Sequence, residues 1–179
     1  MPIPVLETPR LRLRGHRSAD LPDCVAMWSD LNVTRFITGR ASTEQQTWIR
    51  LLSYVGHWAL QGFGYWAIEE KESNDFVGEA GLADFKRDVH ASARNVPELG
   101  FALVSRVHAK GYATECVRAV LSWADANLRS TRTVALASPQ NPASLRVLAK
   151  CGYEAFDRGV YNDQPVVFFV RDAGSPSAF

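Results

Sequence analysis

The chain has 179 residues, of which 46% are apolar and 22% are charged. This balance predicts a folded protein with a sizeable core and excludes an intrinsically disordered chain. The formal net charge of +1 gives no general attraction to nucleic acid or to an anionic membrane. No apolar run approaches the roughly 20 residues of a membrane helix, and residues 1–10 lack the basic start and apolar stretch of a secretion signal. We therefore expect no nucleic-acid partner and no membrane association.

The three cysteines, Cys24, Cys116 and Cys151, are widely spaced and form no Cys-x-x-Cys motif. Isolated cysteines in odd number indicate free thiols in a reducing compartment, so we expect a cytoplasmic protein. No group of His, Cys, Asp and Glu has the spacing of metal ligands, and we expect no metal site. Because no repeat or linker divides the sequence, residues 1–179 are interpreted as one domain with its core at about 6–171.

The N-terminal segment predicts a short strand followed by a helix. Residues 10–14 alternate arginine with leucine, and we interpret these arginines as one solvated face of a strand. Ser18 and Asp20 are candidates for the cap of a helix that runs through residues 25–28. Pro22 is compatible with the first turn of that helix.

A longer helix is predicted next, with Ser42 and Gln45 as its capping box and its end at Gly62 or Gly64. We expect the core-facing stripe of this helix to consist of Trp48, Leu51, Leu52, Val55 and Ala59.

Two hairpins are expected, one before and one after the centre of the chain. The first joins strands at Tyr65–Glu70 and Asp75–Phe85, and the second joins strands at Phe156–Tyr161 and Val166–Arg171. Residues 87–95 form a polar, mobile loop in this interpretation, and the tail at 173–179 is expected to be frayed.

The most informative stretch is ELGFALVSRVHAKGYATE at residues 98–115. It predicts a strand over Glu98–Val104, a loop, and a helix that opens at Gly111 and runs to about Asn127. A helix start presents unpaired backbone N–H groups and the positive end of the helix dipole. Small residues there let a phosphate approach, which makes this region a candidate anion site. The alternative is a helix-start glycine without any chemical role.

A second segment follows the predicted strand at 133–137. Asn141 suits the N-cap of a short helix, Pro142 its first position and Gly152 its stop. Helix capping alone explains these residues individually. It does not explain why both segments occur in one chain.

Together these segments resemble the GCN5-related N-acetyltransferases (GNAT), and within them the ribosomal-protein alanine acetyltransferase-like branch. The motifs that carry the resemblance are ELGFAL, GYATE and NPASLRVLAKCGY, together with the opening LETPRLRLR and the later FGYWAI. The similarity extends from about Leu6 to Arg171. It implies an α/β (α+β) fold in which helices flank a mixed, mostly antiparallel central sheet that is splayed at the cofactor site.

The resemblance implies acetyl-coenzyme A (acetyl-CoA) as the acetyl donor. It implies that the pantetheine arm pairs, like an added strand, with the backbone of Phe101, Ala102 and Leu103. Asn141 and Ser144 would hydrogen-bond the pantetheine region from the far side, and Arg146 and Lys150 would either screen phosphate charge or simply be exposed cations. The pyrophosphate would be held by backbone N–H groups of His108, Ala109, Lys110, Gly111, Tyr112 and Ala113.

Two residues depart from the family's pattern in this loop. His108 stands where relatives commonly have Gln, Arg or an aromatic residue, and Ala109 stands where they usually have Gly. If residue 109 needs a positive φ, alanine costs roughly 1 kcal/mol or more. We expect this to weaken cofactor binding without abolishing it.

Glu98 is the first candidate for the general base that accepts the amine's proton, with Asp84 and then His90 as alternatives. A solvated carboxylate at a strand end is the other reading of Glu98. Many relatives place a tyrosine acid at the position of Leu148, so this chain lacks that residue. Tyr161 is a candidate substitute, and departure as thiolate with water as the proton source is another route.

The leading hypothesis is therefore an N-acetyltransferase that acts on a primary amine, either a protein N-terminus or a small molecule such as an amino acid, a polyamine or an antibiotic. An acyl-CoA-binding sensor with little turnover is a second hypothesis. A dinucleotide-dependent oxidoreductase is excluded because no Gly-x-Gly-x-x-Gly fingerprint is present. The sequence leaves the oligomeric state open, with a homodimer as one candidate.

Overall fold

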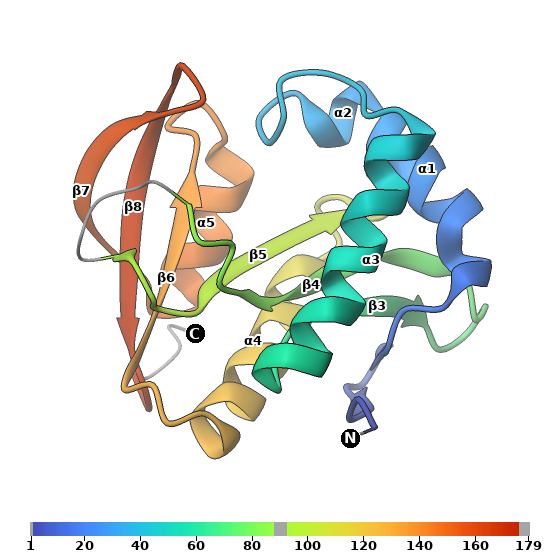
Figure 1. Ribbon diagram of the computed structural model, residues 1–179, viewed down its shortest axis with the longest axis horizontal. Helices are drawn as coiled ribbons and strands as arrows, with labels where there is room; N and C mark the ends of the chain where they lie inside the picture. The colour runs from blue at the N-terminus through green and yellow to red at the C-terminus, as the bar shows by residue number, and fades with distance from the viewer. Residues whose placement is uncertain (1, 88–92, 176–179) are drawn as a thin grey trace.

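The computed structural model describes residues 2–87 and 93–175 as an eight-stranded sheet with helices on both faces (Figure 1). The strand order is β1-β2-β3-β4-β5-β6-β8-β7. Among these strands only β5 and β6 pair in parallel. The predicted fold, a mixed and mostly antiparallel sheet flanked by helices, is therefore confirmed. The strands are β1 (Leu6–Glu7), β2 (Leu11–Arg14), β3 (Tyr65–Glu70), β4 (Phe76–Ala83), β5 (Glu98–Leu103), β6 (Arg132–Ala137), β7 (Glu154–Tyr161) and β8 (Gln164–Asp172).

The helices divide between the two faces of the sheet. Helices α1 and α3 lie over one face, while α4 packs against the opposite face (Figure 1). The helices are α1 (Leu21–Ser29), α2 (Leu31–Thr34), α3 (Glu44–Gln61), α4 (Tyr112–Asn127) and α5 (Pro142–Lys150), and 3₁₀ turns span Ser18–Asp20 and Ser105–Val107.

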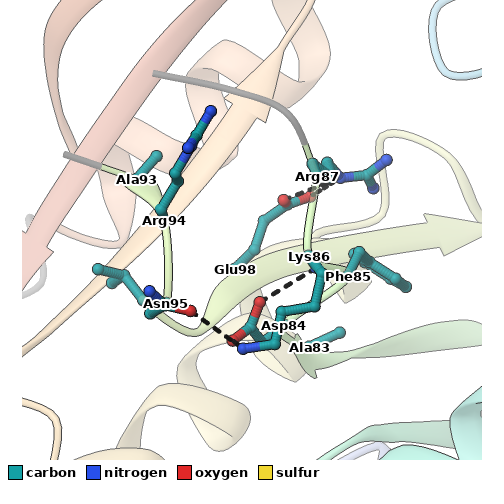
Figure 2. A pocket seen from close by; sticks show the side chains of 10 residues that line it. Ala83, Asp84, Phe85, Lys86, Arg87, Ala93, Arg94, Asn95 and Glu98 are labelled. Carbon is teal, nitrogen blue, oxygen red and sulfur yellow. Dashed lines mark hydrogen bonds and ion pairs between the residues drawn. The ribbon is translucent and has the colours of Figure 1, made fainter. Parts of the chain in front are cut away.

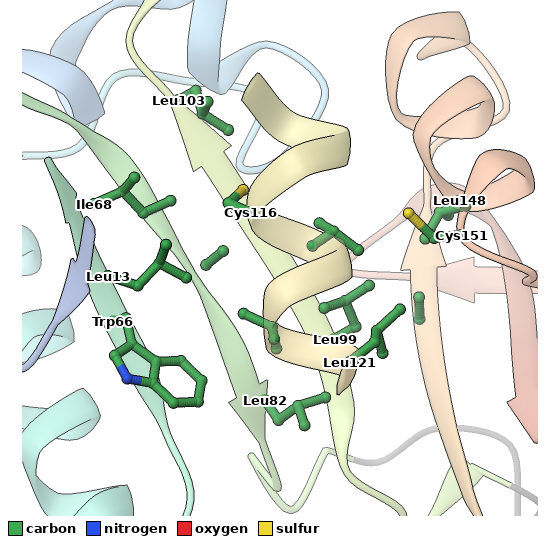
Figure 3. Close-up of a cluster of buried hydrophobic side chains, with 14 of the residues drawn as sticks. Leu13, Trp66, Ile68, Leu82, Leu99, Leu103, Cys116, Leu121, Leu148 and Cys151 are labelled. Carbon is green, nitrogen blue, oxygen red and sulfur yellow. The ribbon is translucent and has the colours of Figure 1, made fainter. Parts of the chain in front are cut away.

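The largest core cluster lies between the sheet and α4 (Figure 3). Alternate residues of β5, including Leu99 and Leu103, point into it, and Cys116 and Leu121 of α4 meet them. All three cysteines are free, as the sequence predicts, and they are buried. No helix in the described ranges combines the length and the apolarity needed to cross a membrane.

The N-terminal arginines differ from the prediction. Arg14 is 8% exposed and pairs with Asp20, with Nη2 to Oδ1 at 2.7 Å, and its Nε lies 2.7 Å from Glu69 Oε1. Asp20 is therefore an ion-pair partner as well as the residue before α1, and its side chain accepts no hydrogen bond from the amides of α1. The expected solvated arginine face is wrong at Arg14 because a buried guanidinium is stable when carboxylates pair with it.

The cap and the buried face of α3 also differ from the prediction. The capping box is Thr43 with Gln46, one residue beyond the predicted pair. The expected core stripe is wrong except at Leu51, because Trp48, Leu52, Val55 and Ala59 are exposed. The buried residues of α3 are Thr47, Leu51, Tyr54 and Trp58, and Gly62 ends the helix with φ +74° as expected.

Both predicted hairpins are confirmed as β3–β4 and β7–β8. The described part of the C-terminal tail is held by hydrogen bonds, because Ala173 N–H donates to Thr131 O at 2.8 Å and Ser175 N–H donates to Asp172 O at 3.1 Å. The expected fraying is therefore wrong for residues 173–175. Residues 88–92, which include the candidate base His90, and residues 176–179 lie outside the described residues.

Candidate active site

Strands β5 and β6 pair over a very short length and then diverge (Figure 1). Only Glu98 with Val134 and Leu99 with Ala135 are in register. Backbone groups of successive strand residues point to opposite sides. Pro97 O accepts from Val134 N–H on the β6 side, whereas Val104 N–H donates to Val77 O on the β4 side. Phe101 and Leu103 therefore direct their backbone groups into the opening between β5 and β6, while those of Ala102 face β4.

The loop between β5 and α4 contains two residues with a positive φ just before the helix. Ala109 has φ +61° and Gly111, the N-cap of α4, has φ +82°. Ala109 therefore has the positive φ that was considered for it in the sequence analysis, and this conformation is strained for a residue with a Cβ. The first N–H groups of α4, from Tyr112 onward, have no acceptor within the helix and leave an anion-binding end.

His108 contacts the same strand edge. Its Nε2 lies 2.8 Å from Leu103 O, a hydrogen bond in which the ring N–H donates to the carbonyl. Leu103 O is one of the groups that the pairing of β5 directs into the opening. The imidazole therefore uses an acceptor that an added strand would also use.

Arg10 fixes the loop from outside, a contact that the sequence interpretation missed. Its Nη1 donates to Lys110 O at 2.9 Å, and its guanidinium lies 4.4 Å from the centre of the Tyr112 ring. Glu115 in the first turn of α4 accepts hydrogen bonds from Arg10 Nε at 2.7 Å and from Thr8 Oγ1 at 2.6 Å. No local pattern predicts this contact, because about a hundred residues separate the partners.

Asn141 and Ser144 lie beyond the end of β6, across the opening from β5. Asn141 caps α5 as predicted, since its Oδ1 accepts from Ser144 N–H at 3.2 Å. Its Nδ2 also donates to Ser144 Oγ at 2.8 Å. Leu148 is buried in the main core, and Arg146 and Lys150 are exposed.

Glu98 lies in a polar cavity of about 330 Å³ at the other end of β5 (Figure 2). Arg87 Nε is 3.0 Å from Glu98 Oε2, and Arg87 Nη1 donates to Tyr161 Oη at 2.7 Å. The structure therefore brings Glu98 and Tyr161, two residues singled out in the sequence, to the same guanidinium. Asp84 also lines the cavity and pairs with Lys86, with Oδ2 to Nζ at 2.6 Å.

The electrostatic setting of Glu98 differs from that of a solvated strand end. Burial raises the pKa of Glu98 above its ordinary value, and the positive charge of Arg87 offsets only part of this effect. Its side chain is 14% exposed. A partly accessible carboxyl with a raised pKa can exchange a proton nearer to neutral pH than an ordinary glutamate can.

A second buried carboxylate, Glu79 on β4, was not predicted. Its Oε1 accepts hydrogen bonds from Tyr54 Oη at 2.6 Å and Trp28 Nε1 at 3.1 Å. His16 Nε2 lies 3.6 Å from Glu79 Oε2, and the donor atoms of His16, Cys24 and Glu79 all lie within 4.8 Å of one another. No local pattern predicts this cluster, because its members come from three separate segments: the loop after β2, α1 and β4.

These features agree with a comparison against protein families. A family model described as an acetyltransferase (GNAT) domain matches residues 10–154. This chain belongs to the GNAT acetyltransferases. Its membership makes it an acyl-CoA-dependent acyltransferase by family.

Individual GNAT relatives cover most of the chain. The uncharacterised N-acetyltransferase YoaA of Bacillus subtilis is 28% identical over 156 residues, which is 84% of this chain and 83% of YoaA. A Bordetella pertussis protein assigned to the GNAT family has a similar structure, with a TM-score of 0.84 and 27% identity over 94% of this chain and 99% of that one. Spermidine N-acetyltransferase from Vibrio cholerae, solved with CoA and spermine, shares the fold with a TM-score of 0.75 at 15% identity, over 94% of this chain and 98% of that one.

The described residues fit the CoA group that the GNAT family uses. The edge of β5 at Phe101 and Leu103 has no partner on the β6 side among the described strands, although His108 occupies Leu103 O, and it leads toward the unpaired amides at the start of α4. The strand edge suits an extended amide chain such as pantetheine, and the helix start suits a diphosphate.

Proposed function

We propose that this protein transfers the acetyl group of acetyl-CoA to a primary amine. The observation that carries the proposal is the short parallel pairing of β5 and β6, which leaves Phe101 and Leu103 without a partner on the β6 side among the described strands, with Leu103 O occupied by His108. In this proposal Phe101 and Leu103 bind the pantetheine arm, and Ala102 supports them from within the β4–β5 pair. Asn141 and Ser144 contact the arm from the β6 side. The amides of Ala109, Gly111, Tyr112 and Ala113 hold the pyrophosphate. The predicted amides of His108 and Lys110 are not included, because they donate to Ser105 O at 3.1 Å and to Val107 O at 3.4 Å.

We assign the general-base role to Glu98. Its raised pKa and its place in a polar cavity, one residue before the last residue of β5 that pairs with β6, support this role. Arg87 competes for the carboxylate, so proton acceptance requires this ion pair to loosen or a water molecule to relay the proton. An N-terminal α-amine, with a pKa of about 8, is partly neutral at physiological pH. It therefore needs a weaker base to remove its proton than a lysine amine does.

For the acceptor we propose a protein N-terminal α-amine. Ribosomal-protein-S5-alanine acetyltransferase of Vibrio fischeri shares the fold at 17% identity, which is compatible with this choice. A small cationic amine is the second candidate. The size of the cavity favours it, because about 330 Å³ suits a compact polar ligand. The charge of the lining does not, because Lys86, Arg87 and Arg94 line the cavity together with Asp84 and Glu98.

Two experiments test the proposal. Calorimetric titration of CoA into the folded protein should give saturable binding, and its absence would refute the cofactor assignment. Release of free thiol from acetyl-CoA should then be measured with N-terminal peptides, lysine peptides blocked at the N-terminus, polyamines and aminoglycosides. Faster turnover with the free N-terminal peptides supports the first acceptor class, and turnover only with polyamines or aminoglycosides supports the second.

An acyl-CoA-binding protein with little turnover is a further candidate, favoured by the His108 contact on Leu103 O and by the strained Ala109. CoA binding without transfer to any of these amines would select it. The free buried cysteines support a reducing compartment, and we place the protein in the cytoplasm. A homodimer is a prediction that light scattering would test.

A further inference from the structure

Gly100 makes room for a tyrosine hydroxyl at the point where β5 leaves β6. Leu99 is the last residue of β5 in register with β6, and Gly100 follows it directly. A Cβ atom built on Gly100 would lie 1.9 Å from Tyr65 Oη. Side chains essentially never approach so closely. The Tyr65 hydroxyl therefore occupies the space that any other residue at position 100 would fill.

Tyr65 is held firmly in this position. It is the first residue of β3 and is 7% exposed. Its ring stacks on Tyr54 at 4.3 Å with an interplanar angle of 5°. Tyr54 in turn donates a hydrogen bond to the buried carboxylate of Glu79 at 2.6 Å. The buried network described above thus positions the Tyr65 ring.

The Tyr65 hydroxyl itself has no hydrogen-bond partner within the described ranges. This hydroxyl is not one of the fully buried polar atoms that lack a partner, so it stays accessible enough to donate a hydrogen bond to a ligand. Burial, and next the nearby Glu98 carboxylate, raise the pKa of Tyr65 well above its ordinary value. The phenol therefore stays protonated and remains a hydrogen-bond donor over the whole range in which an enzyme works.

Glu98 and Gly100 are two residues apart on β5, so they present the same face of the strand. Tyr65 lies over that face at Gly100, and Glu98 lies in the cavity on that face. A proton acceptor and a free hydrogen-bond donor thus flank the point where the strands separate. Attack of an amine on a thioester uses two such groups, a base for the proton of the amine and a donor for the carbonyl oxygen.

We propose that Tyr65 Oη donates a hydrogen bond to the carbonyl oxygen of the acetyl thioester and stabilises the negative charge that develops there. This inference rests on the proposed function. The amine nitrogen donates its lone pair to the carbonyl carbon, the C–N bond forms, and the π electrons move to the oxygen that Tyr65 contacts. The nitrogen loses its proton to Glu98. The C=O bond then re-forms, the C–S bond breaks, and its electrons leave on sulfur as a thiolate that water protonates. Tyr65 keeps its proton throughout.

Tyr65→Phe removes the donor and keeps the ring stack on Tyr54. We expect kcat to fall about 100-fold, within the range found when one such donor is removed. The affinity for CoA, measured by calorimetry, should stay within twofold. The affinity for acetyl-CoA should fall about fivefold, as expected for one lost hydrogen bond. Tyr153→Phe is the matched control, because it removes a buried hydroxyl that is hydrogen-bonded to Thr133, and it should leave both affinities and kcat within twofold.

Gly100→Ala provides an independent test. Its Cβ should displace the hydroxyl and lower kcat to about the level of Tyr65→Phe. The double variant should be no slower than Tyr65→Phe, because the two changes remove the same interaction.

A Tyr65→Phe variant with kcat within threefold of wild type and unchanged preference for acetyl-CoA over CoA would overturn the inference. A double variant in which the reductions of kcat from Tyr65→Phe and Gly100→Ala multiply would also overturn it. Wild-type protein that binds no CoA or transfers no acetyl group would instead refute the proposed function, so the two failures are distinguishable.

Discussion

Replacing Ala109 by glycine should stabilise the folded protein. Ala109 has φ +61°, in the left-handed region, which costs an L-residue with a Cβ about 1–2 kcal/mol. Glycine removes this strain. It also gives the unfolded chain more freedom, which offsets about 0.4–1 kcal/mol. The free energy of unfolding should therefore rise by about 0.5–1 kcal/mol, or about 1–4 °C in Tm for a chain of this length.

Equilibrium denaturation with urea, followed by circular dichroism, measures this change. Ala119→Gly is the matched control, since Ala119 lies inside α4 and glycine there should cost about 1 kcal/mol. The two identical substitutions should thus change stability in opposite directions. A fall in stability for Ala109→Gly comparable to that for Ala119→Gly would refute the strain reasoning.

Three further predictions concern the site and the N-terminal ion pair. Glu98→Gln should lower kcat about 100-fold with little change in CoA affinity, and it should remove the acidic limb of the pH–rate profile; unchanged rates would exclude Glu98 as the base. His108→Ala frees Leu103 O and should raise CoA affinity up to about fivefold in calorimetry; a salt-dependent loss of affinity would show that the ring contacts phosphate instead. Asp20→Asn leaves Arg14 with one carboxylate fewer and should cost about 2–4 kcal/mol of unfolding free energy at pH 7. Burial raises the pKa of Asp20, but hydrogen bonds outweigh this and lower it overall, so the wild type loses this stability as the pH falls below the ordinary carboxyl range. The difference between the two proteins in urea denaturation should therefore shrink toward pH 3, and a constant difference would contradict the assignment.

The strands were predictable because their signals are local. Apolar runs flanked by turn residues locate β3, β5 and β6 almost to the residue. The same holds for α4 and α5, whose starts are marked by Gly111 and by Asn141 with Pro142. Such boundaries depend on local backbone preferences, and the residue types at the boundary set these preferences.

The buried face of α3 was not predictable in the same way. Two arcs of this helix carry apolar residues at helical spacing, and periodicity alone does not tell which arc meets the sheet. The buried arc includes Thr47 and Tyr54, whose polar atoms find partners inside: Thr47 Oγ1 donates to Thr43 O and Tyr54 Oη donates to Glu79. Trp48, which looked like a core residue, is instead on the exposed arc.

The candidate site also has a part that the sequence predicts and a part that it does not. The loop from His108 to Ala113 is contiguous in sequence, so its identification needed no tertiary information. The clamp of Arg10 on this loop, the meeting of Glu98 with Arg87, and the approach of Tyr65 to Gly100 join distant segments. Side-chain contacts of this kind depend on strand order and register, which a single sequence does not reveal.

The absence of a tyrosine at position 148 has a structural consequence for the mechanism. Leu148 is buried in the core, so position 148 of helix α5 contributes no hydroxyl. The phenol that lies against Gly100, where β5 leaves β6, is that of Tyr65 on β3. A donor on β3 approaches from the α3 face of the sheet, where Tyr54 and Glu79 hold it. Disturbing this support should therefore affect catalysis without touching the substrate. Loss of the Glu79 carboxylate should displace the Tyr65 ring more than it displaces the loop of residues 108–111, because α4 and this loop pack on the opposite face of the sheet.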